Sequence, residues 1–353
     1  MSRLSTLLSA ALLLALAAPG ALAQPAAGAA PELQPLNGAS LADALARPLG
    51  AAVSAPRTRG TLDLKDKRFY IAEYRVLIDQ SGELPVAPRD GRLLGLQLAG
   101  DSVRLSYRSQ PDIAALQTLV DRGWADLLLR LAAVGVNPTT PEQIISAHGA
   151  IFEATEPGSS QAAPLTVEAK TGETTRRYLV LAPTGGKLVH QMPGGLDIGN
   201  LAARLSYPRH QVEALSLTLA VNLSALDNSS QRRSGYALAP GVEALSPQME
   251  LGPAPAAALV HAHAQRALVN LNEALLLAPE FGRLRLASAA EAAKPNSPLQ
   301  ALISLGKSLT SSQQTTLETV LELDGPATAR LLMYSLQAAN QAIANTLQAA
   351  LAP

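Results

Sequence analysis

The sequence predicts an α+β protein, with a mixed α/β arrangement as the alternative, in which a sheet packs against two long helices. Several short segments alternate between apolar and polar residues, most clearly over 213–223. Two longer segments, near 111–134 and 326–351, carry apolar residues at helical spacing. The strands occur singly and in pairs between these two helices, and no internal repeat of fixed period is present.

Residues 1–23 have the layout of a secretory signal peptide. Arg3 supplies a positive start, Leu7 to Ala18 is an apolar run, and Pro19-Gly20 precedes a small-residue cleavage site ending at Ala23. The run is shorter than the ~20 apolar residues of a membrane-spanning helix. We therefore expect cleavage near Ala23 and a periplasmic or secreted protein. Because the chain has no cysteine, a lipid-modified cysteine anchor is excluded.

After the signal peptide the sequence divides into an arm and a globular region. Residues 24–60 are rich in Ala and Pro and predict a linker or loosely attached arm. Residues 61–353 form the predicted α+β globular region, with a candidate subdomain boundary near 225–255. The first element of this region is a central strand over 68–79, which is aromatic and β-branched, followed by a turn at 80–83.

Two further strands precede the first long helix. We expect one strand over 91–99 and a half-buried strand over 102–108. The helix near 111–134 has Pro111 near its first turn and ends at Gly135. Its predicted apolar stripe consists of Ile113, Leu116, Leu119, Val120, Trp124, Leu127, Leu128 and Leu131. Trp124 lies on this stripe, so it is predicted to be a core residue.

The middle of the chain is predicted to be mainly β. Segments 165–169 and 176–182 are strands joined by a tight turn, a glycine-rich loop spans 183–195, and 213–223 is the clearest strand. Within 240–315 the pattern is ambiguous, because 257–277 fits either a strand or a helix. We expect short elements at 283–287 and 299–309.

A strand over 319–324 leads into the second long helix, 326–351. The apolar seam of this helix consists of Leu332, Leu336, Ala339, Ile343, Leu347 and Leu351. Its other face is Gln, Asn and Thr with almost no charge, whereas exposed helices usually carry charge. The helix is therefore expected to pack on both sides, either within the domain, which we favour, or against a partner.

Composition excludes several classes of function. Lys plus Arg and Asp plus Glu both number 28, so there is no electrostatic case for nucleic acid or anionic lipid as a partner. The absence of cysteine excludes thiol catalysis and cysteine metal sites. Asp and Glu residues are expected mostly on solvated faces.

No catalytic, cofactor-binding or metal-binding residue is assigned, and no cofactor is expected. His261 and His263 form the only close histidine pair; on a strand they share one face, but no third ligand is suggested by local spacing. Residues 184–187 resemble part of a phosphate-binding loop but lack its glycine spacing, so they predict a turn. No Gly-x-Ser-x-Gly elbow is present.

These observations favour an exported, non-enzymatic bacterial envelope protein that binds other proteins or assists assembly. The strand–helix order of 68–79 and 111–134 resembles the periplasmic α/β domains of curli-secretion-type assembly proteins; the resemblance covers less than half of the chain and assigns no residue. The expected partners are other envelope proteins, or a second copy bound through the C-terminal helix. The alternative is a periplasmic hydrolase or small-ligand-binding protein with a site near 183–195 that includes His190.

Overall fold

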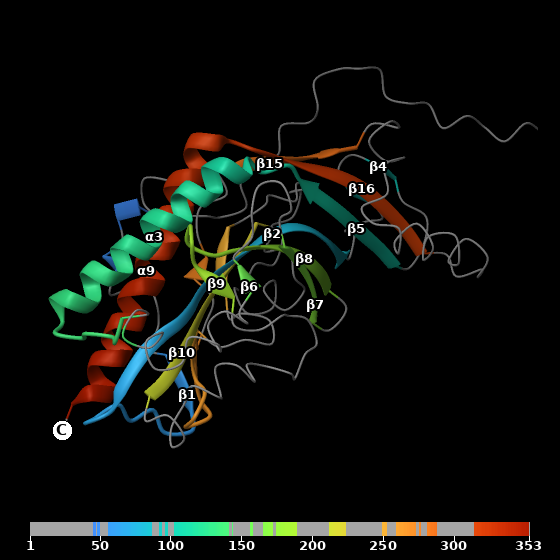
Figure 1. Cartoon of the computed structure of the whole chain (residues 1–353). Helices are drawn as coiled ribbons and strands as arrows, with labels where there is room; N and C mark the ends of the chain where they lie inside the picture. The colour runs from blue at the N-terminus through green and yellow to red at the C-terminus, as the bar shows by residue number, and fades with distance from the viewer. Residues whose placement is uncertain are drawn as a thin grey trace, which may run out of the picture. The chain divides into compact units, whose positions relative to one another are not determined.

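The computed structural model confirms the α+β class (Figure 1). The structure describes residues 45–46, 48–49, 56–86, 92–93, 96–97, 102–140, 143, 156–157, 165–171, 174–188, 212–223, 249–252, 259–272, 275–276, 281–287 and 314–352. All of them belong to the compact unit Leu33–Pro353. The predicted element at 299–309 and most of 225–255 lie outside these residues, so the subdomain boundary stays a prediction.

One large mixed sheet organises the described part of the chain. Its main path runs β1-β13-β12-β10-β2-β5-β16-β15, and β8 adds β7 while β11 adds β14. The strands are β1 (Arg57–Arg59), β2 (Arg68–Val86), β5 (Ser102–Ser109), β7 (Leu165–Thr171), β8 (Thr174–Leu181), β10 (Val212–Asn222), β11 (Glu250–Gly252), β12 (Val260–Ala262), β13 (Ala267–Asn270), β14 (Leu275–Leu276), β15 (Gly282–Leu286) and β16 (Gln314–Leu323). The described part of the ambiguous segment 257–277 therefore contains the strands β12, β13 and β14 and no helix.

β2 is longer than predicted, and the turn expected at 80–83 does not form. The strand continues to Val86 through an irregularity between Asp79 and Ser81. On one edge β2 pairs with β10 before this point and with β5 after it, while β8 pairs along the other edge. Gly82 permits the continuation, because a Cβ there would lie 2.5 Å from the Thr175 carbonyl oxygen.

The prediction of a single strand over 91–99 is also wrong. Two short strands, β3 (Arg92–Leu93) and β4 (Leu96–Gln97), pair with each other antiparallel as a small hairpin. A similar short pair joins β6 (Glu156–Pro157) to β9 (Lys187–Leu188). The predicted 165–182 hairpin is confirmed, because β7 and β8 pair from Leu165↔Val180 to Thr171↔Thr174.

The first long helix, α3 (Ile113–Ala133), is capped at both ends. The Asp112 carboxylate accepts from the N–H groups of Ala114 and Ala115, and Gly135 follows the helix with a positive φ of 74°. Pro111 directly precedes the cap and so lies near the first turn, as predicted. Leu128 is 42% exposed, so its assignment to the buried stripe is wrong, whereas Leu127 is fully buried.

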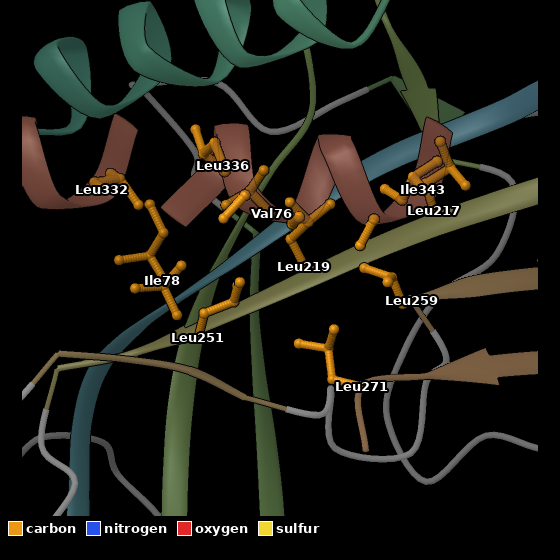
Figure 2. Close-up of a cluster of buried hydrophobic side chains, with 14 of the residues drawn as sticks. Val76, Ile78, Leu217, Leu219, Leu251, Leu259, Leu271, Leu332, Leu336 and Ile343 are labelled. Atoms are coloured by element: carbon orange, nitrogen blue, oxygen red, sulfur yellow. The ribbon is translucent and has the colours of Figure 1, made fainter. Parts of the chain in front are cut away.

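The second helix, α9 (Gly325–Leu351), packs on both sides within the chain, as favoured. In Figure 2 its seam residues Leu332, Leu336 and Ile343 lie beside side chains of β2 and β10, and α3 packs along the helix. The helices approach closely at Gly123, whose carbonyl oxygen accepts from Asn340 Nδ2 at 2.8 Å. Asp324 caps the helix and Pro326 occupies its first turn. The intramolecular contacts account for the apolar seam.

The main core lies between these helices and the sheet. Val76 and Ile78 of β2 and Leu217 and Leu219 of β10 face α9 and are almost completely buried (Figure 2). Tyr74 extends the same face toward Trp124, with ring centroids 5.5 Å apart. The core position predicted for Trp124 is thus confirmed. Among the described residues, no helix is long and apolar enough to cross a membrane.

Candidate functional site

The face of β2 and β10 that points away from α9 carries buried polar residues. Every residue of β10 is buried, including the polar positions that alternate with its leucines. Because β2 and β10 are parallel neighbours, Glu73 lies beside Ser216, and Arg75 lies beside Thr218. The expectation that carboxylates are mostly solvated is therefore wrong for Glu73, which is 3% exposed.

Six of these residues form what we call the histidine cluster: Glu73, Arg75, Ser216, Thr218, His261 and His263. The rings of His261 and His263 lie 4.1 Å apart, and His263 Nε2 is 2.7 Å from Ser216 Oγ. Of the two arrangements that the sequence left open for this pair, the structure has the extended one, with His261 in β12 and His263 directly after it. Across the cluster, Arg75 donates to Thr218 Oγ1 at 2.9 Å, and its Nε lies 3.1 Å from Glu73 Oε1.

Burial governs the ionisation of the histidine cluster. It lowers the pKa of His261, with Glu73 opposing and Arg75 reinforcing the shift. Burial also lowers the pKa of Arg75, and Glu73 opposes that shift. The cluster therefore has one fixed ion pair, Glu73–Arg75, beside an imidazole that resists protonation.

Ser216 and His263 lie as close together as a nucleophile and its general base, but a substrate cannot reach them. Ser216 is 1% exposed and lies in the middle of a strand that is paired on both edges. A nucleophilic serine must be reached by its substrate. In this conformation the pair works as a hydrogen bond that ties β12 to β10.

A second group, which we call the tyrosine cluster, follows farther along the same face. It consists of Asp79, Tyr107, Arg176, Tyr178 and Asn222. Asp79 Oδ2 accepts from Tyr107 Oη at 2.6 Å and from the Leu223 N–H at 3.2 Å, and Arg176 Nε lies 3.8 Å away. Tyr178 Oη donates to Asn222 Oδ1 at 2.8 Å.

The tyrosine cluster is held in one charge state. Burial, and then the charge of Asp79, raise the pKa of Tyr107 well above its ordinary value. Burial alone would lower the pKa of Arg176, but Tyr107 and Asp79 raise it above its ordinary value. The tyrosines therefore stay protonated and Arg176 stays charged at neutral pH.

The predicted glycine-rich site is described only up to Leu188. Pro183 to Gly186 form a turn in which the Gly186 N–H donates to the Pro183 carbonyl and Gly185 has a φ of 76°. This confirms the turn predicted instead of a phosphate loop. Both the N–H and Oγ1 of Thr184 donate to the Asp121 carboxylate of α3 at 2.7 Å. His190 lies outside the described residues, as do His148 and His210.

A third feature is the outer face of α3, which we define as its exposed residues. They are Ala114, Ala115, Thr118, Arg122, Ala125, Leu128, Leu129, Ala132 and Ala133. Leu129 is 72% exposed, and Arg122 is the one charged side chain of the set. A solvent-facing helix surface is ordinarily polar, and contiguous exposed apolar surface marks an interaction site.

Sequence reasoning missed the clusters but had a signal for them. Glu73 and Arg75 alternate with Tyr74 and Val76 in a strand otherwise read as central. Charged residues at every second position of a central strand indicate buried ion pairs when the neighbouring strand carries hydroxyls in register. That register is set only by strand pairing, which local patterns do not supply.

No group of three or more His, Asp or Glu side chains that could hold a metal ion occurs in the part of the chain that the structure describes. No protein family, curated protein or solved structure matches this chain. The function therefore has to be argued from the surfaces and clusters themselves.

Proposed function

We propose that this chain is an exported bacterial envelope protein that acts by binding another protein through the outer face of α3. The observation that carries the proposal is the exposure of Leu128 and Leu129 within an alanine-rich helix surface. The layout of residues 1–23 supports the exported location.

The buried clusters support binding over catalysis. In the described sheet, the side chains best suited to catalysis are already hydrogen-bonded to each other, as the pairs Ser216–His263 and Asp79–Tyr107. Ser216 and Asp79 are each no more than 1% exposed. Such groups stabilise and specify the packing of the sheet, and they present no reactive atom to a substrate.

The composition of the outer face favours a protein over a membrane surface. A helix that lies on a membrane carries several Lys or Arg residues beside its apolar face. Here Arg122 is the single exposed charge, and the remaining positions are mostly alanine and leucine. Alanines allow another backbone to approach closely, which suits a protein partner.

Arg122 also distinguishes between a second copy and a different partner. It lies near the middle of the outer face, so an antiparallel pairing of two α3 helices would bring like charges together. We therefore infer a partner surface, either a helix or a strand, that is apolar and carries a carboxylate opposite Arg122. Burial of Leu129 and a charge pair at Arg122 would then reinforce each other.

The test introduces a photo-crosslinking residue at position 129 of the full chain in a producing bacterium. The matched control places it at Ala349, which is exposed on α9. We expect one discrete adduct with a different exported protein from position 129 only. The purified partner should bind the Leu129→Glu variant about tenfold more weakly than wild type, since a leucine that is buried in the complex is replaced by a charge. It should bind the Ala349→Glu variant as tightly as wild type.

Three outcomes would count against the proposal. An adduct between two copies of the chain would show that the outer face binds a second copy and not a different protein. Equal labelling at positions 129 and 349 would mean that the outer face is not a contact surface. Unchanged affinity after Leu129→Glu would contradict the assignment of the surface.

A further inference from the structure

The margin of the sheet formed by β12, β13 and β1 is joined to the rest by a short seam. β12 pairs with β10 at Leu215↔Ala262, Ser216↔His261 and Leu217↔Val260, and one further backbone hydrogen bond lies on each side of these pairs. By contrast, β10 and β2 pair from Val212↔Arg68 to Val221↔Ile78, with a register shift between Leu215 and Ser216. The β10–β12 seam is therefore the shorter junction, and we expect the margin to open there.

Both described histidines of the chain lie on this seam. His261 is opposite Ser216, and His263 binds Ser216 Oγ while its backbone N–H donates to the Ala214 carbonyl. The two rings are in contact at 4.1 Å. We propose that the His261–His263 pair is a pH-sensitive latch, which holds the β12–β13–β1 margin to β10 when neutral and releases it when protonated.

Charge accounts for the release. With both rings neutral, the histidine cluster contains the anion Glu73 and the cation Arg75, which already pair with each other at 3.1 Å. Protonation would add two cations in contact, beside a buried arginine and with no further carboxylate in the cluster. Separation of β12 from β10 lets water solvate both rings.

Among the described residues, β2 contributes Glu73, Arg75 and Tyr70 to the face that carries the pair, and burial raises the pKa of Tyr70 so that it stays neutral. Glu213 of β10 alternates to the other face and accepts from the Ala264 N–H and from Gln265, just beyond His263. The only cation among these groups, Arg75, adds to the repulsion.

The sign of the pH dependence follows from the direction of the shifts. Burial lowers the pKa of His261 in the folded chain. Stability from this group is therefore complete above about pH 6.5, the ordinary value, and is lost as pH falls through the lowered folded pKa. Burial raises the pKa of Glu213, so its contribution has the opposite sign. Comparison of a histidine variant with wild type separates the histidine contribution to the pH dependence of stability from that of Glu213.

Hydrogen exchange of the full chain tests the latch. From about pH 7.5 to about pH 5.5, after correction for intrinsic exchange, we expect protection over 260–270 to fall about tenfold while 214–221 remains protected. The double variant His261→Gln and His263→Gln should keep the same protection at both pH values, since glutamine can bind Ser216 without becoming charged. His148→Gln is the matched control and should behave as wild type.

Wild-type exchange that is unchanged by acidification would overturn the latch, whatever the variants do. It would equally fail if the double variant lost protection as wild type does. Should the double variant not fold, His261→Gln alone decides, because His261 is only half-buried. It must lose less protection than wild type on acidification, and an equal loss refutes the proposal.

Discussion

At the scale of single residues, Gly82 shows that close approach of neighbouring strands can exclude a side chain. Gly82 lies where β2 passes between β8 and β5, and a Cβ there would be 2.5 Å from the Thr175 carbonyl oxygen and 2.7 Å from Tyr107 Oη. The same residue that suggested a turn in the sequence is thus required for an uninterrupted strand.

Gly82→Ala is expected to destabilise the chain by about 3 kcal/mol, because a carbonyl oxygen of a paired strand cannot move aside. Urea unfolding followed by circular dichroism measures the change. Gly325→Ala is the control, since a Cβ at Gly325 meets nothing within 4 Å, and it should change the free energy of unfolding by less than about 0.5 kcal/mol. Equal effects of the two substitutions would refute this account of Gly82.

The buried polar residues belong to the same scale. Alternation identified Ser216 and Thr218 as one face of a strand, but it did not say that this face is covered. Burial and pairing of Glu73 and Arg75 depend on which strand lies beside β2, which is decided by contacts between residues far apart in the sequence. That is why the sequence showed two histidines close together in the chain but did not predict the cluster around them.

At the scale of elements, the two long helices were well predicted. Their spacing, their Asp112 and Asp324 caps and the glycine after α3 are local signals, and the structure places both helices within a few residues of the expected bounds. The error lay in the width of the α3 stripe. Leu128 continues the apolar pattern in sequence, yet α9 and the sheet cover only the side centred on Leu127.

Substitution of adjacent leucines tests this orientation of α3. Leu127→Ala should cost about 2–5 kcal/mol, because the residue is completely buried and leaves a cavity. Leu129→Ala should change the free energy of unfolding by less than about 0.5 kcal/mol, since the side chain is 72% exposed. Thermal or urea unfolding measures both, and a large loss at Leu129 would mean that the outer face is covered in the isolated chain.

At the scale of the whole molecule, the proposed exported location rests on the first residues. In a signal peptide, an apolar run like that between Leu7 and Ala18 must stay uncharged. We expect the chain recovered from the cell envelope or medium to begin at Gln24.

Leu13→Arg together with Leu14→Arg should leave an uncleaved chain inside the cell, because charge in the apolar segment blocks its recognition. Ala27→Arg, just after the predicted cleavage site, is the control and should be exported normally. Cell fractionation with N-terminal sequencing distinguishes these results. Export of both variants to the same extent would show that residues 1–23 do not direct it.

The sequence by itself determined the α+β class, the two long helices, the β7–β8 hairpin and the alternating strand β10. These features follow from the period of apolar residues and from caps and turns, which act over a few neighbouring residues. Only the tertiary structure decided that β2 runs on past Asp79, that the polar face of β10 is buried and that Leu128 is exposed. Each of these depends on which distant segment lies alongside, and local periodicity carries no information about that choice.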